Sequence, residues 1–260
     1  MTLKTKNVNI KKLLFAKSVL KFFERILFEC LKLFFSVKPD KKKYSMQIPE
    51  NFYSPWINDK NFNQSYQDIK YNTFLDIYKL YELWKIVEQV KDKNGHILEV
   101  GAWRGGSACL IAKKCKIEGL NNKIFIADTF KGLVKISSKD STYTGGEHAD
   151  TSVEVVKNLT KKMKLDNTII LKGIFPEDTG KKIENLKFKL CHIDVDVYQS
   201  GKDVFNWVWE RMVIGGVVVF DDYGGLLTNG ISKLVDDEYV KKDRIVIHNL
   251  NGHALMVKVL

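Results

Sequence analysis

The sequence predicts an α/β fold whose parallel sheet is covered on both faces by helices. Five short apolar runs, bounded by charged residues or glycines, follow one another at 96–99, 123–128, 168–171, 188–193 and 217–220. Such runs are typical of strands buried on both faces. Between the last two, Ser200–Met212 has the length and apolar spacing of a crossover helix. Parallel strands joined in this way end at one edge of the sheet, where open α/β sheets bind ligands.

Residues 1–43 predict a basic amphipathic helix followed by a polar linker, Lys38–Lys43. From Leu13 to Phe35, charged residues recur every three or four positions, and the remaining helix surface is apolar, with six phenylalanines. Residues 1–50 contain 12 Lys and Arg against four Asp and Glu, a net charge of +8, whereas the other 210 residues have a net charge of +3. The basic character of the chain therefore belongs mainly to this extension.

Two interpretations of the extension remain open. Its charges make it a poor membrane span and interrupt any secretory apolar core. A basic amphipathic helix can instead lie on an anionic membrane surface, so residues 8–36 are a candidate for peripheral membrane contact. The alternative is packing on the catalytic domain or on a second subunit of a homo-oligomer. We expect a cytoplasmic protein, held at the inner membrane face if the first interpretation holds.

Residues 44–92 are expected to form a helical, aromatic cap on the acceptor side of a catalytic domain at 93–260. Aromatic side chains are frequent at its start: Tyr44, Phe52, Tyr53, Trp56, Phe62 and Tyr66. They could cover an acceptor pocket, because sugars often stack on aromatic faces, or they could pack into the core. Thr73–Val90 then reads as a strongly amphipathic helix.

The chain closes with a helix and a hairpin. Ile231–Tyr239 has helical apolar spacing. Residues 244–259 alternate like two strands joined by a turn at Asn251 and Gly252.

The loop after the first predicted strand is the first candidate ligand site. The strand ends in Glu99, turns through Gly101 and enters a helix at Gly105, Gly106 and Ser107. Glycines let the backbone approach a ligand closely. A dinucleotide fold would show G-x-G-x-x-G, whereas this loop has an acid just before its first glycine. That favours S-adenosylmethionine, which carries positive charge and hydroxyls, although a plain strand–helix turn remains an alternative.

The next two strands extend this site. Asp128 ends the second strand, 29 positions after Glu99, and can accept hydrogen bonds from both ribose hydroxyls. The alternative is an acidic residue that merely opens a loop. The third strand leads into a loop in which Phe175 could cover an adenine ring.

Two aspartate pairs follow the last two parallel strands. Asp194 and Asp196 end one apolar run, and Asp221 and Asp222 end the next. Since both strands end at the same edge, three or four carboxylates should converge there. Their mutual repulsion predicts a bound cation, and oxygen-only ligands suit Mg²⁺, with Mn²⁺ as an alternative.

Five segments together resemble the motif series of the macrocin O-methyltransferase family, which comprises metal-dependent sugar O-methyltransferases. They lie in the family's order between Thr73 and Gly224: EVGAWRGGS (99–107), ADTFKGL (127–133), GIFPEDT (173–179), HIDVDVYQS (192–200) and GGVVVFDDYG (215–224). The resemblance implies a doubly wound, seven-stranded, Rossmann-like methyltransferase fold with S-adenosylmethionine as methyl donor and a divalent cation.

The resemblance also implies residue roles. Asp194, Asp221 and Asp222 would hold the metal, and Asp196 would be a candidate for the general base. The expected cofactor contacts are Glu99, Gly101, Trp103, Arg104, Gly105, Ser107, Asp128, Thr129, Phe175 and Asp194. Val195 stands where the family often has glycine, which would narrow the acceptor space.

Two residues are candidates for the general base, Asp196 and His148. Asp196 could instead orient a ligand or cap the following helix. His148, in a loop from Gly132 to Asp150 that could form a lid, is the rival base because histidine titrates nearest neutrality. A lone loop histidine is more often simply exposed. In related catechol-type enzymes a lysine follows the first metal aspartate by three residues; here Val197 stands there, which counts against a phenolic acceptor.

Other functional classes explain less of the sequence. A metal-dependent nucleotide-sugar glycosyltransferase would account for Asp194-Val-Asp196 but not for Glu99 or the second aspartate pair. Nucleic-acid binding is not expected, because residues 51–260 are nearly charge-balanced. The four cysteines form no C-x-x-C pair and are expected to be reduced. The expected acceptor is a small molecule or glycan: a sugar nucleotide, surface polysaccharide or glycolipid.

Overall fold

The computed structural model of the protein describes residues 10–35, 44 and 53–260. The chain divides into two compact units, residues 1–54 and 55–260. In the first unit, helix α1 (Ile10–Phe35) occupies the segment for which a helix was predicted. The predicted linker and Phe52 lie outside the described residues. Within the described ranges, no helix combines the length and apolarity needed to cross a bilayer.

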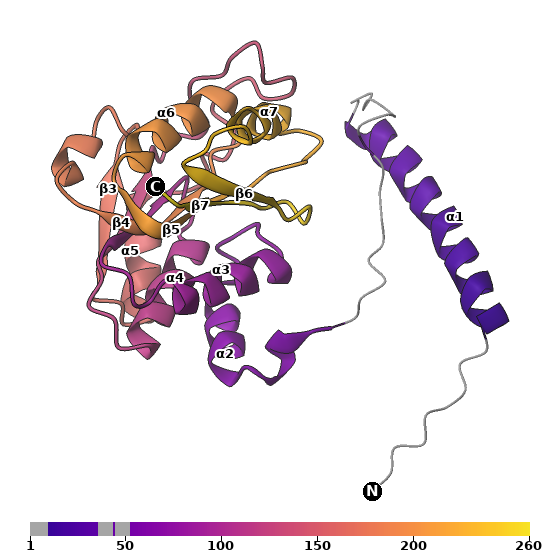
Figure 1. The fold of residues 1–260 in the computed structure, drawn as a ribbon, viewed down its shortest axis with the longest axis horizontal. Helices are drawn as coiled ribbons and strands as arrows, with labels where there is room; N and C mark the ends of the chain where they lie inside the picture. The colour runs from indigo at the N-terminus through magenta and orange to yellow at the C-terminus, as the bar shows by residue number, and fades with distance from the viewer. Residues whose placement is uncertain (1–9, 36–43, 45–52) are drawn as a thin grey trace, which may run out of the picture. The chain divides into compact units, whose positions relative to one another are not determined.

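A seven-stranded sheet forms the centre of the second unit (Figure 1). Its strands are β1 (His96–Val100), β2 (Ile124–Asp128), β3 (Thr168–Lys172), β4 (Phe188–Ile193), β5 (Met212–Phe220), β6 (Arg244–His248) and β7 (Ala254–Lys258). The order is β3-β2-β1-β4-β5-β7-β6; the first five are parallel, and β7 pairs antiparallel with both β5 and β6. The seven-stranded α/β prediction is therefore confirmed.

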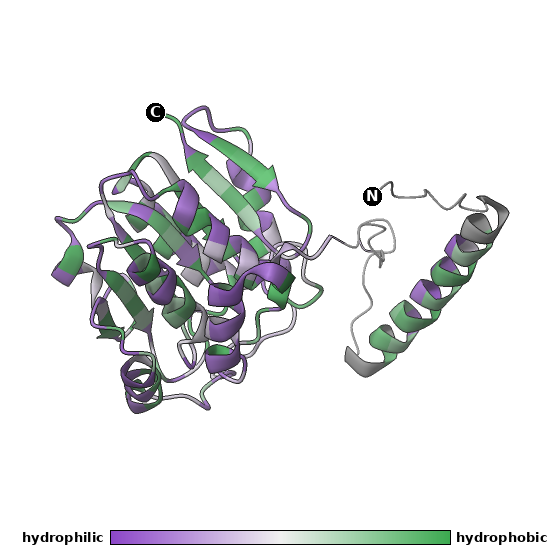
Figure 2. Cartoon of the chain, turned by 90° about the horizontal axis from the view of Figure 1, so that it is seen from below, coloured by the Kyte–Doolittle hydropathy of each residue, from purple (hydrophilic) through white to green (hydrophobic). Residues whose placement is uncertain are grey.

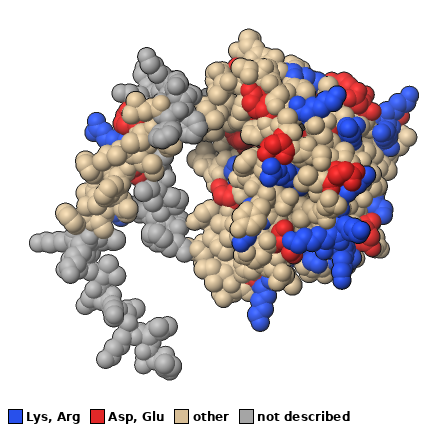
Figure 3. Space-filling view, turned by 180° about the vertical axis from the view of Figure 1, so that it is seen from behind, with Lys and Arg blue, Asp and Glu red and all other residues tan. Residues whose placement is uncertain are grey.

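Helices cover both faces of this sheet (Figure 1). One face packs against α2 (Lys60–Ile69), α3 (Ile77–Gln89), α4 (Gly106–Ile117) and α5 (Val153–Lys162). The other packs against α6 (Tyr198–Trp209) and α7 (Asn229–Glu238). Short 3₁₀ helices lie at Pro55–Asn58 and Gly180–Ile183. Figure 2 shows the apolar strands enclosed between helices with mixed surfaces, and Figure 3 shows acidic and basic side chains interspersed over one face of this unit.

Two predicted helix boundaries were wrong. The crossover helix α6 ends at Trp209, and Met212 instead opens β5, where it pairs with Phe188 of β4 and is buried. Helix α3 begins only at Ile77, because the Asp76 side chain accepts hydrogen bonds from the first free backbone N–H groups of that helix. Local capping and strand pairing thus overrode the apolar spacing.

Helix α2 (Lys60–Ile69) lies in the segment predicted to be a helical, aromatic cap, but no individual helix was predicted there. Asp59 caps it by accepting the Phe62 N–H, and the same side chain accepts the indole N–H of Trp84. The Phe62 ring is fully buried, with its centroid 4.9 Å from that of Tyr81. The aromatic residues of this segment therefore include core residues that fasten α2 to α3. The buried thiols of Cys109, Cys115 and Cys191 are free, as predicted.

Candidate active site

A cavity of about 310 Å³ lies where β1, β2, β4 and β5 end. The loops that follow these strands line it, together with Thr73, Phe74 and Leu75 before α3, Lys79 within α3 and parts of loop 132–148. Both aspartate pairs and the glycine loop face this one space. The edge of the sheet that the strand connections predict as the ligand site is thus the edge at which the structure forms a pocket.

Three carboxylates gather at the tips of β4 and β5. These strands are parallel neighbours, with Ile193 level with Phe220, so the residues just after each strand are adjacent. Carboxylate oxygens of Asp194, Asp221 and Asp222 all lie within 4.8 Å of one another. Residues 27 positions apart in sequence are therefore brought together by the crossover through α6.

The electrostatics of this cluster favour a bound cation. Although the pocket leaves part of Asp194 accessible, its enclosure by protein and its neighbours Asp221 and Asp222 raise its pKa well above the usual range. Burial, followed by Asp221, raises the pKa of Asp222 in the same direction. One oxygen of Asp222 is buried without a hydrogen-bond partner. An all-oxygen donor set with such an oxygen fits a hard divalent ion.

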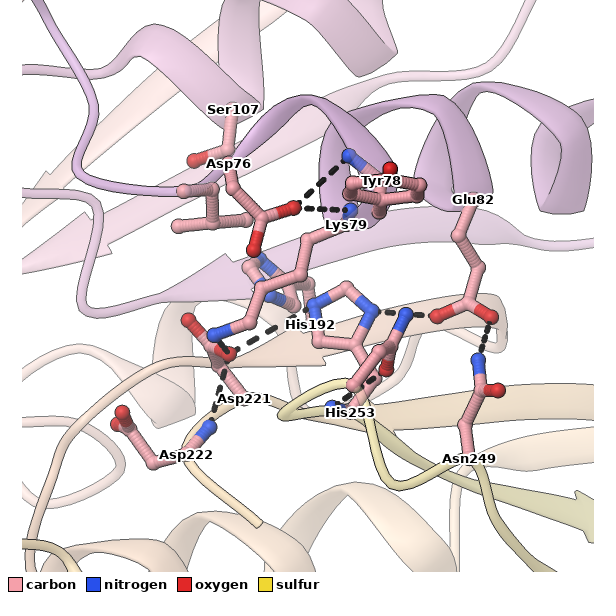
Figure 4. Close-up of polar contacts among 12 residues, drawn as sticks. Asp76, Tyr78, Lys79, Glu82, Ser107, His192, Asp221, Asp222, Asn249 and His253 are labelled. Carbon is pink, nitrogen blue, oxygen red and sulfur yellow. Dashed lines mark hydrogen bonds and ion pairs between the residues drawn. The ribbon is translucent and has the colours of Figure 1, made fainter. Parts of the chain in front are cut away.

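Lys79 of α3 reaches this cluster and was missed by the sequence analysis. Its ammonium group contacts Oδ1 of Asp221 (Figure 4). Burial alone would lower the pKa of Lys79, but the charge of Asp221 and that side chain's hydrogen bond outweigh burial and raise it. The available signal was the helical spacing: Lys79 lies on the same face of α3 as Leu83 and Ile86, four and seven positions later, and both are buried. A lysine on such a buried face needs a partner.

A second group of ligand-type side chains shares Asp221. His192, Asp221 and His253 are all buried and offer atoms within 4.8 Å of one another. Nδ1 of His253 shares a hydrogen bond with Glu82, and its Nε2 lies 3.7 Å from Oδ1 of Asp221 (Figure 4). Asp221 belongs to both groups, but neither His192 nor His253 lines the cavity, whereas Asp194 and Asp222 do. We therefore favour the all-oxygen group.

Asp196 and His148, the two candidate bases, both line the pocket. Oδ1 of Asp196 accepts a 3.1 Å hydrogen bond from the Tyr143 hydroxyl, and burial raises the pKa of Asp196. The His148 ring lies edge-on to Tyr143 and to Phe74. Asp196 does not cap the following helix: the first N–H of α6, from Tyr198, donates to Asp140.

The backbone at both aspartate pairs is held in an unusual conformation. Asp196 and Asp222 have positive φ angles of 61° and 69°. Residues other than glycine rarely adopt this conformation, although aspartate tolerates it better than most. Such backbone strain is concentrated at functional sites.

The glycine loop approaches the cluster closely. Gly101 has a φ of 90°, and a Cβ there would lie 1.6 Å from the carbonyl oxygen of Asp194, so no other residue fits. Asp128 accepts the N–H groups of Trp103 and Phe130 at 2.8 and 2.6 Å, which fixes the loop after β1 against the end of β2. Burial raises the pKa of Asp128.

Most of the expected cofactor residues line the cavity, but three do not. The lining includes Gly101, Trp103, Ser107, Asp128, Thr129, Phe175 and Asp194. Glu99 lies beneath it, fully buried, and accepts a hydrogen bond from Ser107. Arg104 pairs with Asp150 instead, and Gly105 lies at the N-terminus of α4 against Val156.

The aromatic edge of the pocket comes from an unexpected place. None of the described residues 53–70 lines the cavity. Phe74 does, and although its side chain is exposed, its ring stacks on Trp103 with 4.1 Å between centroids. With the edge-on His148, these rings form an aromatic rim beside the aspartates.

The sheet order and the site at its carboxyl edge define the class I methyltransferase, Rossmann-like fold. Within that class, residues 70–250 match the macrocin O-methyltransferase (TylF) family model. The chain belongs to this family, as the motif series indicated.

Curated relatives are distant. The chain is 27% identical over 166 residues to demethyldecarbamoylnovobiocin O-methyltransferase of Streptomyces niveus, covering 58% of this chain and 62% of that protein. It is 29% identical over 142 residues to mycinamicin III 3''-O-methyltransferase of Micromonospora griseorubida, covering 50% and 55%. The chain thus spans less than two thirds of the length of these relatives.

Solved structures support the fold. The O-methyltransferase NovP superposes with a TM-score of 0.63 at 20% identity, over 73% of this chain and 83% of its own. The calicheamicin methyltransferase CalS11 gives the same TM-score at 15% identity, over 85% and 97%. At these identities the likeness concerns the fold alone.

Proposed function

We propose that this protein transfers a methyl group from S-adenosylmethionine to a sugar hydroxyl, with a divalent cation. One observation carries the proposal: the glycine loop, the β2 aspartate and the four aspartates after β4 and β5 line a single cavity. Family membership supports the reaction type. A relative named for an acceptor with a rhamnosyl group, the tetracenomycin 4'-O-methyltransferase of Streptomyces olivaceus, supports a sugar acceptor.

The cofactor half of the cavity is assigned to the residues after β1, β2 and β3. Asp128 keeps acceptor capacity for ribose hydroxyls, because each carboxylate oxygen has two lone pairs and each takes one backbone N–H. Phe175 offers an apolar surface to the adenine. Because Gly101 has no side chain, the loop after β1 can pass close to Asp194. The methionine end of the cofactor can then approach that residue. S-adenosylmethionine supplies an electrophilic methyl group on its sulfonium.

The acceptor half is assigned to the aspartates. Asp194, Asp221 and Asp222 would hold the cation, preferably Mg²⁺ and alternatively Mn²⁺. Bound there, the ion would supply Lewis acidity that makes the acceptor hydroxyl more acidic and fixes its position. Asp196 takes the hydroxyl proton as the oxygen–methyl bond forms and the sulfur–methyl bond breaks, which leaves a neutral thioether. Its raised pKa brings it closer to the neutral range that suits a base.

The aromatic rim and loop 132–148 are assigned to acceptor binding. Phe74 and Trp103 present stacked rings at the pocket edge, where a sugar face can lie. The Tyr143 hydroxyl orients Asp196. Family membership argues against the glycosyltransferase alternative, which a titration with a nucleotide diphosphate would test directly.

Melting temperatures test the proposal without knowledge of the acceptor. At about 100 times its Kd, S-adenosylhomocysteine should stabilise the protein by about 2.7 kcal/mol. For a chain of this size that raises the Tm by about 5–10 °C. Mg²⁺ should raise the Tm further by relieving carboxylate repulsion, and a chelator should remove only that second increase. No shift with S-adenosylhomocysteine would sink the assigned cofactor, and a shift with uridine diphosphate would favour the glycosyltransferase.

A lysine variant tests the cation site separately. Lys79→Met removes the ammonium group that partly neutralises the carboxylates. We expect the Tm of the metal-free protein to fall by at least about 2 °C. We also expect Mg²⁺ to bind more tightly, because the site becomes more negative. Lys85→Met is the matched control, since Lys85 lies on the same helix and contacts Glu88 outside the cavity. Equal Mg²⁺ affinity in both variants would contradict a role for Lys79 at the site.

A further inference from the structure

Helix α1 has two chemically different faces along its described length. Eight large apolar side chains between residues 15 and 33 fall within about half of the helix circumference at 3.6 residues per turn. They are Phe15, Val19, Leu20, Phe22, Phe23, Ile26, Leu27 and Leu33, and each is exposed. Lys17, Lys21 and Arg25 lie on the opposite half, together with Glu24 and Glu29. Figure 2 shows the same division, with hydrophilic patches interrupting one side of a largely hydrophobic helix.

The exposure of the apolar face is large for a protein surface. Phe15, Phe22 and Leu33 are 72%, 62% and 83% exposed. Contiguous exposed apolar surface of this kind marks a contact site for another protein or for a membrane. The width of the apolar face and the charge of the segment distinguish a protein partner from a membrane.

We propose that α1 lies flat on an anionic lipid bilayer with its apolar face in the headgroup–acyl boundary. A coiled-coil seam is narrower, because it uses two positions in seven. An apolar half-circumference opposite a charged face is typical of interfacial helices. The net charge of +8 in residues 1–50, against +3 in the other 210, adds attraction to acidic headgroups.

The dimensions of the helix fit this position. Its 26 residues span about 39 Å at 1.5 Å per residue, and the phenylalanines extend along most of the described side chains. In the interface plane such a face is buried by about 5–10 Å, while the aliphatic stems of lysines extend their charges toward water and lipid phosphates. The proposed contact is peripheral, and none of the described helices meets the requirements of a membrane span.

Vesicle flotation with the full-length protein tests the proposal. The probes are vesicles of phosphatidylcholine mixed with phosphatidylglycerol and vesicles of phosphatidylcholine alone. We expect at least about tenfold stronger partitioning onto the anionic vesicles at low ionic strength, and a decrease as salt is added. Equal partitioning onto both vesicle types, or none onto either, would overturn the proposal.

Variants identify the face that makes the contact. Phe22→Ser combined with Phe23→Ser should weaken partitioning by at least about tenfold, because two buried aromatic side chains are lost. Phe28→Ser is the control: it removes one half-buried phenylalanine from the opposite half of the same helix and should retain vesicle binding. The melting temperature of each variant and its response to S-adenosylhomocysteine should equal those of the parent protein, because the cofactor pocket lies within residues 73–222.

Light scattering in lipid-free buffer tests the alternative that a second subunit covers the apolar face of α1. If the parent protein is dimeric and fails to bind vesicles, and the double variant is monomeric, the apolar face is a subunit interface and the proposal is wrong. If both proteins have the same oligomeric state and only the parent binds anionic vesicles, the proposal stands. Neither result depends on the catalytic assignment, since no methyl transfer is measured.

Discussion

Asp221→Asn is expected to lower turnover by at least about a hundredfold while leaving S-adenosylhomocysteine binding intact. Replacing even an outer partner of a metal ligand costs about 10–100-fold in affinity or activity, and Asp221 is assigned as a ligand itself. Its carboxylate lies with Asp194 and Asp222 and also contacts Lys79. The measurements are kcat with a sugar acceptor, Mg²⁺ affinity by calorimetry and cofactor affinity by Tm shift.

The matched control for this variant is Asp237→Asn. Asp237 is an exposed aspartate on α7 that pairs with Lys233, so the same chemical change there should leave turnover and both affinities unchanged. If Asp221→Asn kept full turnover, Asp221 would not be a ligand of the proposed cation. Loss of cofactor binding in that variant would mean that the substitution disturbs the whole pocket, which the melting temperature would also reveal.

Asp196→Asn should lower turnover by about 10²–10⁴-fold, the usual contribution of a positioned general base. Mg²⁺ and S-adenosylhomocysteine should still bind, because Asp194, Asp221 and Asp222 remain. The amide cannot accept the hydroxyl proton, although it can keep the hydrogen bond from Tyr143. The decisive comparison is between kcat, which should fall, and Mg²⁺ affinity, which should not change.

His148→Asn is the discriminating partner of that variant, since both side chains line the cavity. If Asp196 is the base, the histidine variant should lose far less turnover than the aspartate variant. If the histidine variant lost more turnover than the aspartate variant, His148 would be the general base. Asp166→Asn, at an exposed aspartate that pairs with Lys116, controls for the loss of one negative charge.

The convergence of the aspartates was predictable because it depends only on strand connectivity. Two buried runs joined by a helix-length crossover must end at the same sheet edge, and Asp194 and Asp221 each follow such a run directly. Gly101 and Asp128 were predictable for the same reason. Each follows or ends a parallel strand, so each lies at this edge.

Other site features could not be predicted from local patterns. Glu99 belongs to a strand, where side chains alternate between faces, and it points toward Ser107 of α4 instead of into the crevice. Lys79 precedes Asp221 by 142 positions, and nothing in its helix indicates which strand tip the helix covers. Helix α2 has few apolar residues, and its capping aspartate is also held by Trp84, which is distant in sequence.

The sequence by itself determined the strands, their crossovers and the edge at which the acidic side chains and glycines meet, because apolar runs and connection handedness are local properties of the chain. Only the tertiary structure decided which helix brings an ammonium group to Asp221, which aromatic rings border the cavity and which acid lies beneath it. Those outcomes depend on the packing of helices against the sheet, where residues far apart in sequence meet and no local periodicity specifies the partner.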